Sequence, residues 1–274
     1  MMNLPSLTEI AIQAARDAGY IIQQYMDQEV TVSYKETGTS YAAQVVTEVD
    51  KAAETAILAQ LLPTCQAFDL ALLSEETEDD RSRFEKDYFW CIDPLDGTLP
   101  FIQKRPGFSV SIALVNKDGI PLVGVVFDPT TNTLYHAIQG KGAFKNQQVW
   151  ELQPINDHLT YVTDRQLKNT PRAGEIEYFL QEKVADLGLQ GVKEMAGGGS
   201  VLNAIRVLEN GPACMLKFPK KEKGGGSLWD FAATACLFQA LGSPATNFEG
   251  GRLDLNRREG TFMNHQGIFF AYGF

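Results

Sequence analysis

The spacing of apolar residues in the first half of the chain alternates between a helical and a strand period. Apolar residues recur at helical spacing from Leu7 to Tyr25, after a capping box at Ser6-Leu7-Thr8-Glu9, which predicts a long first helix. A second helix is predicted from Val45 to Leu62, where Pro63 would stop it. A strand at 30–35 and a polar loop at Gly38-Thr39-Ser40 are expected between them.

Short apolar runs follow the second helix and predict a sheet. Two buried strands are expected at 70–73 and 88–92. Three more are expected at 108–115, 122–127 and 134–138, separated by turns rich in Asn, Asp and Gly, which is the pattern of an antiparallel meander. Helices combined with such a sheet indicate an α+β fold.

The pattern changes after residue 150. Strands are expected at 161–163, 192–195 and 215–218, and helices at 175–187, 200–208 and 228–241. We therefore divide the chain into an N-terminal α+β half, 1–150, and a C-terminal α/β half, 151–274.

Composition and charge narrow the class of protein. A chain of 274 residues, 44% of them hydrophobic, can bury a large core. The net charge of −10, with a single basic run at 217–223, argues against nucleic-acid polymers and anionic membranes as partners. Four widely spaced cysteines favour free thiols in a reducing cytoplasm. No run approaches the roughly 18 apolar residues of a membrane span, so a cytoplasmic protein is expected.

Acidic residues lie where predicted strands end. Asp93 and Asp96 directly follow the second predicted strand, in a turn whose Pro94 and Gly97 are expected to end that strand. Glu75 follows the first predicted strand, at the carboxyl edge where open α/β sheets bind ligands. Carboxylates combined with a turn carbonyl are the hard oxygen ligands that Mg²⁺ prefers.

Structural roles alone could also explain several of these residues. Asp50 follows Thr47 by three positions and could simply cap the second helix, as Thr98 could cap a helix after the turn. Asp230 lies in the first turn of the helix predicted at 228–241, where a carboxylate is favoured by the helix dipole.

A glycine-rich segment precedes the helix predicted at 200–208. Gly197-Gly198-Gly199-Ser200 would leave backbone N–H groups at a positive helix end, which suits an anion such as a phosphate. A plain loop with Ser200 as the N-cap explains the same residues equally well.

Four motifs in sequence order resemble the inositol monophosphatase family, over nearly the whole chain. They are Thr-x-x-Asp ending at Asp50, Glu-Glu beginning at Glu75, Asp-Pro-x-Asp-Gly-Thr beginning at Asp93, and Trp-Asp-x-Ala-Ala around Asp230. The resemblance implies a layered αβαβα sandwich of the α+β class that forms a homodimer. It also implies a magnesium-dependent, lithium-sensitive hydrolase acting on a small phosphate ester, an inositol or sugar monophosphate.

The resemblance further implies a role for each residue of the site. Two or three Mg²⁺ ions would be held by Glu75, Asp93, the carbonyl of Leu95, Asp96 and Asp230. Asp93 would bridge two ions, and Li⁺ would inhibit. Thr98 with Asp50, and Glu75, would activate a metal-bound water for in-line attack on phosphorus. The substrate would contact Asp96, Gly97, Thr98, Gly199, Ser200 and Asp230.

The remaining positions do not decide between two classes of substrate. Pro100 departs from the family's usual pattern and removes a backbone donor near the site. Asn203 looks more like the inositol branch, whereas the tail at 256–267 looks more like the 3′(2′),5′-bisphosphate nucleotidase branch, which would act on 3′-phosphoadenosine 5′-phosphate. That alternative needs a cation for the second phosphate, and the clustered positive charges are Lys220, Lys221 and Lys223.

Two other classes share part of the pattern. Haloacid-dehalogenase-type phosphatases also use an Asp-Gly-Thr strand end, but with Asp-x-Asp spacing and a phospho-aspartate intermediate, whereas two residues separate Asp93 from Asp96. A non-catalytic relative that binds only a metal or a partner is the other alternative. The presence of every expected ligand and activator disfavours it.

Overall fold

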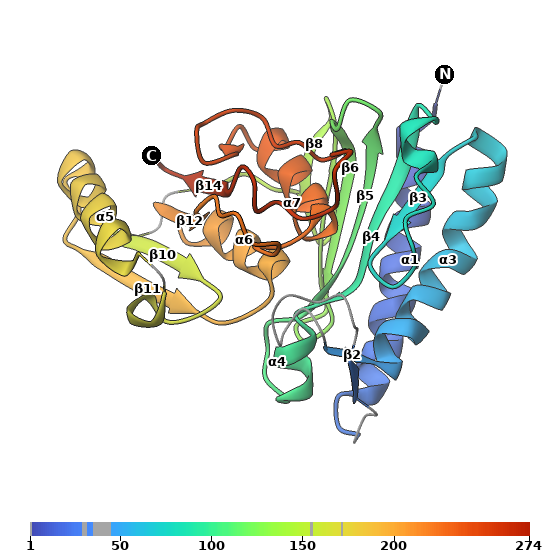
Figure 1. Ribbon diagram of the computed structural model, residues 1–274, viewed down its shortest axis with the longest axis horizontal. Helices are drawn as coiled ribbons and strands as arrows, with labels where there is room; N and C mark the ends of the chain where they lie inside the picture. The colour runs from blue at the N-terminus through green and yellow to red at the C-terminus, as the bar shows by residue number, and fades with distance from the viewer. Residues whose placement is uncertain (1, 29–31, 35–44, 154–155, 171) are drawn as a thin grey trace.

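The computed structural model describes residues 2–28, 32–34, 45–153, 156–170 and 172–274. Its elements form five layers in the order helix, sheet, helix, sheet, helix (Figure 1). The αβαβα sandwich and the α+β class expected from the sequence are therefore confirmed. Within the described residues, no helix is both long and apolar enough to cross a membrane.

The outer helix layer consists of α1 (Leu4–Tyr25) and α3 (Glu48–Phe68), which pack together on one face of the large sheet (Figure 1). Helix α1 begins earlier than predicted, because the side chain of Asn3 caps it by accepting from the Ser6 N–H at 3.3 Å. Pro5 is tolerated in the first turn, where N–H groups have no partner within the helix. The capping box predicted at Ser6 is wrong.

Helix α3 also differs from its predicted bounds. It begins at Glu48 and runs through Pro63 to Phe68, so the expectation that Pro63 stops it is wrong. Thr64 Oγ1 donates to the Leu61 carbonyl at 2.6 Å and accepts from Trp90 Nε1 at 2.8 Å. The bond from Trp90 ties the turn around the proline to the large sheet. Such tertiary packing outweighs the low helix propensity of proline.

The large sheet has seven strands in the order β3-β4-β5-β6-β7-β8-β9. Their bounds are β3 (Ala71–Ser74), β4 (Tyr88–Asp96), β5 (Ser109–Asn116), β6 (Pro121–Asp128), β7 (Thr133–Ile138), β8 (Gly142–Lys145) and β9 (Gln148–Val149). Strands β3 and β4 are parallel, and all later neighbours are antiparallel. The predicted meander is confirmed.

Strand β4 continues past the turn that was expected to end it. It runs through Pro94 to Asp96, and its pairing with β5 shifts register between Asp93 and Asp96. An irregularity of this kind accommodates a proline, whose missing N–H is not needed for pairing there. The prediction that the strand ends before Pro94 is wrong, and both aspartates belong to the strand.

The second half supplies the inner helix layer, the smaller sheet and the last helix. The inner helices are α6 (Ser200–Glu209) and α7 (Leu228–Ala240), and α5 (Ala173–Leu187) packs on the smaller sheet (Figure 1). That sheet has the order β11-β10-β12-β14-β13, with bounds β10 (Leu159–Thr163), β11 (Val192–Ala196), β12 (Ala213–Lys217), β13 (Ala245–Thr246) and β14 (Ile268–Tyr272). The elements predicted in this half are confirmed, with ends shifted by a residue or two.

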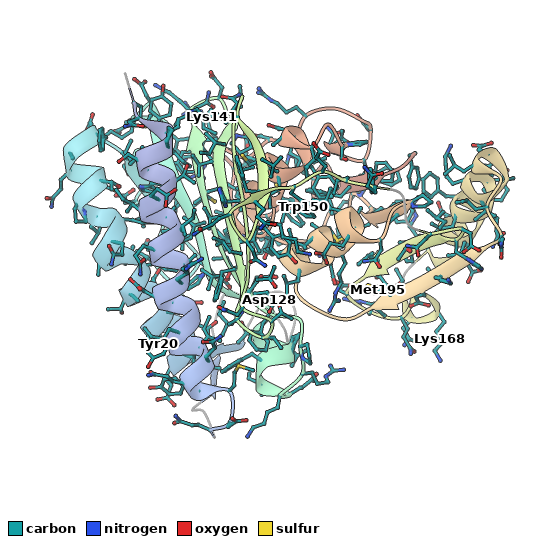
Figure 2. The ribbon with its side chains drawn as sticks, turned by 180° about the vertical axis from the view of Figure 1, so that it is seen from behind. Tyr20, Asp128, Lys141, Trp150, Lys168 and Met195 are labelled. Atoms are coloured by element: carbon teal, nitrogen blue, oxygen red, sulfur yellow. The ribbon has the colours of Figure 1, made fainter. Side chains whose placement is uncertain are left out.

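Short elements connect these layers. The strand predicted at 30–35 is confirmed where it is described, as β1 (Val32–Tyr34), and it pairs with β2 (Val45–Thr47). The loop predicted at Gly38-Thr39-Ser40 lies outside the described residues. Figure 2 shows Trp150 where the chain leaves the large sheet; its ring lies 5.2 Å from that of Tyr135.

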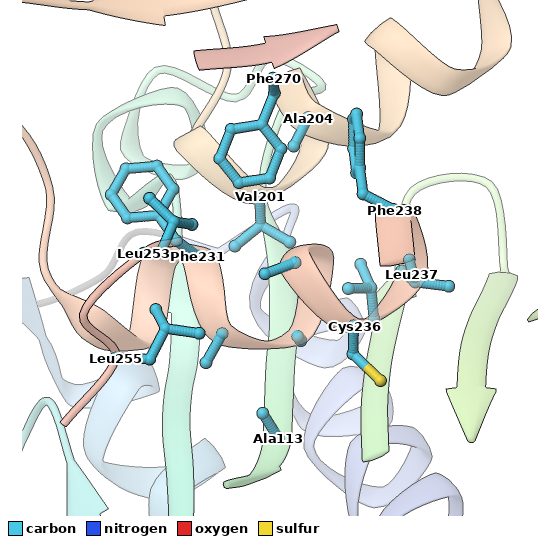
Figure 3. Close-up of a cluster of buried hydrophobic side chains, with 14 of the residues drawn as sticks. Ala113, Val201, Ala204, Phe231, Cys236, Leu237, Phe238, Leu253, Leu255 and Phe270 are labelled. Atoms are coloured by element: carbon cyan, nitrogen blue, oxygen red, sulfur yellow. The ribbon is translucent and has the colours of Figure 1, made fainter. Parts of the chain in front are cut away.

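Helix α7 is the centre of the core (Figure 3). All of its residues from Phe231 to Phe238 are buried, because the helix lies between the large sheet, α6 and the smaller sheet. The rings of Phe238 and Phe270 meet edge to face at 4.8 Å. One hydrophobic cluster therefore joins both halves, and their division at residue 150 stays a prediction.

Gly124 of β6 allows α7 to lie against the large sheet, because a Cβ there would lie 2.3 Å from the Ala233 carbonyl oxygen. We expect Gly124→Ala to lower the free energy of unfolding by about 1–3 kcal/mol, since the helix backbone must move away. Chemical denaturation measures this loss. Gly174→Ala is the matched control, because nothing lies within 4 Å of that Cβ. Equal losses in both variants would contradict this explanation.

Candidate active site

Three carboxylates from two distant parts of the chain meet at the end of β4. Asp93 and Asp96 lie on β4, and Asp230 lies in the first turn of α7. Each offers a carboxylate oxygen within 4.8 Å of the others, and Asp93 and Asp96 are only 1% and 5% exposed. The structure thus brings together three of the residues that the sequence analysis assigned to metal binding.

Asp96 lies at the N-terminus of α6. The Ser200 N–H donates to its Oδ1 at 3.0 Å, and the Val201 N–H donates to its Oδ2 at 2.9 Å. Gly199 permits this contact, because a Cβ there would lie 2.1 Å from Oδ2 of Asp96. Gly199 is also the N-cap of α6, so the alternative with Ser200 as N-cap is wrong. The anion at this helix end is a carboxylate of the protein, with which a substrate would have to share these N–H groups.

Asp230 has the capping role that the sequence suggested. Its Oδ2 accepts from the Ser227 N–H at 2.5 Å, within a capping box at the start of α7. Burial raises the pKa of Asp230 to about 6, and the negative charge of Glu75 contributes to this increase, while the Ser227 N–H opposes it. The same carboxylate therefore caps a helix and belongs to the cluster.

The cluster carries more negative charge than its surroundings can stabilise. Burial, and then the charge of Asp230, raise the pKa of Asp96 well above its usual value despite two N–H bonds. A divalent cation would supply the missing positive charge. Carboxylate oxygens are the donors that hard divalent cations prefer, so the donor set of this cluster fits such an ion.

Thr98 and Asp50 contact each other beside the cluster. The Thr98 hydroxyl oxygen lies 3.1 Å from Asp50 Oδ1 and 3.2 Å from the Leu95 carbonyl oxygen. Oδ2 of Asp50 accepts from the N–H and the hydroxyl of Thr47 at 2.8 and 2.6 Å. Asp50 thus caps α3 and also accepts from Thr98, while its role in activating a water stays a prediction.

Glu75 and Leu95 lie next to the cluster. The Glu75 N–H donates to the Ile92 carbonyl at 3.1 Å, which places this residue beside β4, directly after β3. The Leu95 N–H donates to Asp93 Oδ1 at 3.1 Å. The residues predicted to hold metal therefore lie together at one edge of the large sheet.

Gly97 turns the chain from β4 into the short helix α4 (Thr98–Ile102). It is the N-cap, with a φ of 86°, and a Cβ there would lie 2.5 Å from the Gly107 carbonyl oxygen. Thr98 is the first helical residue, so the alternative that Thr98 caps this helix is wrong. Pro100 lies in the first turn, where the helix needs no N–H, so it breaks no helical bond.

The sequence analysis assigned no role to Lys217, the last residue of β12. Its Nζ lies 3.0 Å from Ser200 Oγ, and its charge lowers the pKa of both Asp96 and Asp230. In the sequence, Lys217 is the first residue of the basic run 217–223, and this run resembles an exposed loop. The signal that could have singled it out is the apolar strand that it ends.

Buried carboxylates between two sheets, next to a bonded threonine–aspartate pair, are the arrangement of a metal-dependent hydrolase. The chain matches the model of the inositol monophosphatase family over residues 3–270, and it belongs to that family. This is a family of metal-dependent phosphatases that act on phosphate monoesters. Membership excludes the haloacid-dehalogenase alternative.

Individual relatives cover almost the whole chain. An inositol-1-monophosphatase of Bacillus subtilis is 29% identical over 251 residues, 91% of this chain and 88% of that protein. A 3′(2′),5′-bisphosphate nucleotidase of Salmonella typhimurium is 30% identical over 267 residues, 94% of this chain and 97% of that protein. A solved IMPase structure from Thermotoga maritima has a TM-score of 0.72 at 22% identity, over 98% of this chain and 92% of that chain, and it confirms the fold.

We expect Asp230→Asn to stabilise the metal-free protein at neutral pH. With a pKa of about 6 against the ordinary 3.8, the wild-type carboxyl lowers stability as the pH rises through this window, whereas an amide does not. In a chelator at about pH 7.5, the variant should gain on the order of 1–3 kcal/mol in unfolding free energy, and the gain should vanish below about pH 4.

In excess Mg²⁺ the wild type should instead be the more stable of the two proteins, because the variant would lack a ligand. Thermal melts with chelator and with Mg²⁺ across this pH range measure both effects. Identical melting temperatures of the two proteins under all conditions would contradict the charge balance described for the cluster.

Proposed function

We propose that this protein is a Mg²⁺-dependent phosphomonoesterase that hydrolyses a small phosphate ester, an inositol or sugar monophosphate. The observation that supports this most directly is the cluster of Asp93, Asp96 and Asp230 beside the bonded pair Thr98 and Asp50. The similarity to an inositol-1-monophosphatase over most of both chains favours the same activity.

The cations would be held by oxygen ligands at the end of β4. Two or three Mg²⁺ ions would bind Glu75, Asp93, the Leu95 carbonyl, Asp96 and Asp230, and Li⁺ would inhibit. Such cations, when bound, lower the pKa of water and stabilise negative charge on a leaving oxygen.

Thr98 and Asp50 would take the proton of the attacking water. The Thr98 hydroxyl has one proton and two acceptors within reach, Asp50 and the Leu95 carbonyl. When the proton goes to Asp50, the lone pairs of Thr98 Oγ1 can accept a proton from water. Asp50 is 3% exposed and accepts two bonds from Thr47, which hold its carboxylate in place. Glu75 would assist as a second acceptor.

Backbone N–H groups and the cluster itself would bind the substrate. The N–H groups of Gly97 and Thr98 begin a helical turn and can donate to phosphate oxygens. The residues that would contact the substrate are Asp96, Gly97, Thr98, Gly199, Ser200 and Asp230. The water oxygen would attack phosphorus, the bond from phosphorus to the ester oxygen would break, and that oxygen would take up a proton from solvent and leave as the alcohol.

We also propose a cytoplasmic homodimer, on the family resemblance. The net charge of −10 favours small anionic substrates delivered to a cation-loaded site over nucleic-acid polymers or anionic membranes as partners. The division into halves 1–150 and 151–274 fits a site in which Asp230 and the glycine-rich segment come from the second half.

A second candidate activity is that of a 3′(2′),5′-bisphosphate nucleotidase. The similarity to the Salmonella nucleotidase covers 97% of that protein, against 88% of the Bacillus monophosphatase. Both candidates remove one phosphate from a small alcohol, so they differ only in what the site does with the rest of the substrate.

We expect phosphate release to depend on Mg²⁺ and to fall below about a tenth of wild type in Asp93→Asn, a barrier increase of at least about 1.4 kcal/mol. The reason is that Asp93 would contact two cations, so its loss weakens both. Inositol 1-phosphate, 3′-phosphoadenosine 5′-phosphate and fructose 1,6-bisphosphate form the substrate panel, with chelator as the metal-free control. A protein that releases no phosphate from any of them with Mg²⁺ would instead be a non-catalytic relative.

We expect Thr98→Val and Asp50→Asn each to lower kcat strongly, and the double variant to be little slower than either. When two residues act as one unit, removing the second lowers the rate little once the first is gone. Thr98→Ser keeps the hydroxyl and is the control that should retain most of the activity. If the two losses instead multiply in the double variant, Asp50 would have only its capping role.

A further inference from the structure

Lys217 projects from the second half toward the carboxylate cluster. It is the last residue of β12, a strand of the smaller sheet that lies beside helix α6 (Figure 1). Its Nζ lies 3.0 Å from Ser200 Oγ, 3.8 Å from Oδ2 of Asp164 and 5.7 Å from the ring centroid of Phe231. The side chain is 21% exposed, so the ammonium is held by the protein and still reaches solvent.

Ser200 connects Lys217 to the reacting centre. The hydroxyl of Ser200 contacts Lys217, while its N–H donates to Asp96 in the cluster. A phosphate ester whose reacting phosphate lies on the cluster and whose other groups extend past Ser200 would therefore meet Lys217. Lys217 is the cation at that position.

The charge balance of the site changes when cations bind. In the metal-free protein, Lys217 contacts Ser200 beside Asp96, so its ammonium offsets part of the negative charge of the cluster. Two divalent cations would neutralise the four negative charges of Glu75, Asp93, Asp96 and Asp230, so the loaded site would no longer attract the ammonium. A nearby anion then becomes the favourable partner of Lys217, with Asp164 as its competitor.

The lysines that the sequence suggested for this role belong to a loop that is bonded to the C-terminal tail. Lys220, Lys221 and Lys223 are exposed, and the backbone of their loop is bonded to Asn264 in the C-terminal tail. In the part of the chain that the structure describes, none of these three side chains has a bond to the carboxylate cluster.

We infer that Lys217 binds the non-reacting phosphate of a bisphosphorylated substrate and is a specificity-determining residue of the site. The inference rests on the proposed phosphatase function and favours its second candidate, because it names the group that distinguishes a bisphosphate from a monophosphate. An ammonium–phosphate contact strengthens binding by about 10- to 100-fold.

Titration calorimetry with Mg²⁺ tests the contact without turnover. Adenosine 5′-phosphate, the product that would keep the second phosphate, is compared with adenosine in the same protein. In the wild type the phosphate should tighten binding at least about tenfold, and in Lys217→Met this advantage should fall to about twofold or less. Lys217→Arg should restore most of it. Because each ratio is taken within one protein, a loss of stability in a variant does not affect it.

Lys193→Met is the matched control, since Lys193 is an exposed residue of β11 in the same sheet. It should keep the wild-type ratio. Three results would overturn the inference: equal binding of the two ligands by the wild type, an unchanged ratio in Lys217→Met, or loss of the ratio in Lys220→Met or Lys221→Met instead. Phosphate release from inositol 1-phosphate is measured in parallel, so that failure of the proposed function is seen separately.

Discussion

The mutual repulsion of three buried carboxylates is the constraint on which this site depends. Asp93, Asp96 and Asp230 each serve the fold, through strand β4 or as a helix cap, and each brings a negative charge to the same small volume. Burial keeps water from screening these charges, and the pKa values of Asp96 and Asp230 rise in consequence. The fold thus holds an excess of negative charge that a divalent cation would neutralise.

The two halves of the protein meet at this excess of charge. Asp96 belongs to the large sheet of the first half but is bonded to the N-terminus of α6 in the second. Glycine backbones allow the approach: the Gly199 N–H donates to the Gly107 carbonyl at 2.7 Å, and a Cβ on Gly107 would lie 2.7 Å from Cα of Gly198. Any movement of α6 relative to β4 would therefore disturb the carboxylate cluster directly.

Local pattern was sufficient to predict the elements and the acidic motifs, but not the contacts between distant segments. The apolar periods located most helices and strands, and the four motifs located the acids. Helix α3 and strand β4 continue through Pro63 and Pro94, contrary to the prediction, because tertiary packing and strand pairing offset the local effect of a proline. The bonds of Asp96 to α6 join residues 104 and 105 positions apart, and Lys217 reaches Ser200 across 17 positions. No local period encodes either contact.

The central claim is that the carboxylates of Asp93, Asp96 and Asp230 form one divalent-cation site. A crystal structure with Mn²⁺ in place of Mg²⁺, analysed by the anomalous scattering of manganese, tests it most directly. We expect an anomalous peak within coordination distance, about 2.0–2.4 Å, of oxygens from at least two of the three carboxylates. Manganese bound elsewhere, with no peak among these carboxylates at millimolar concentration, would contradict it.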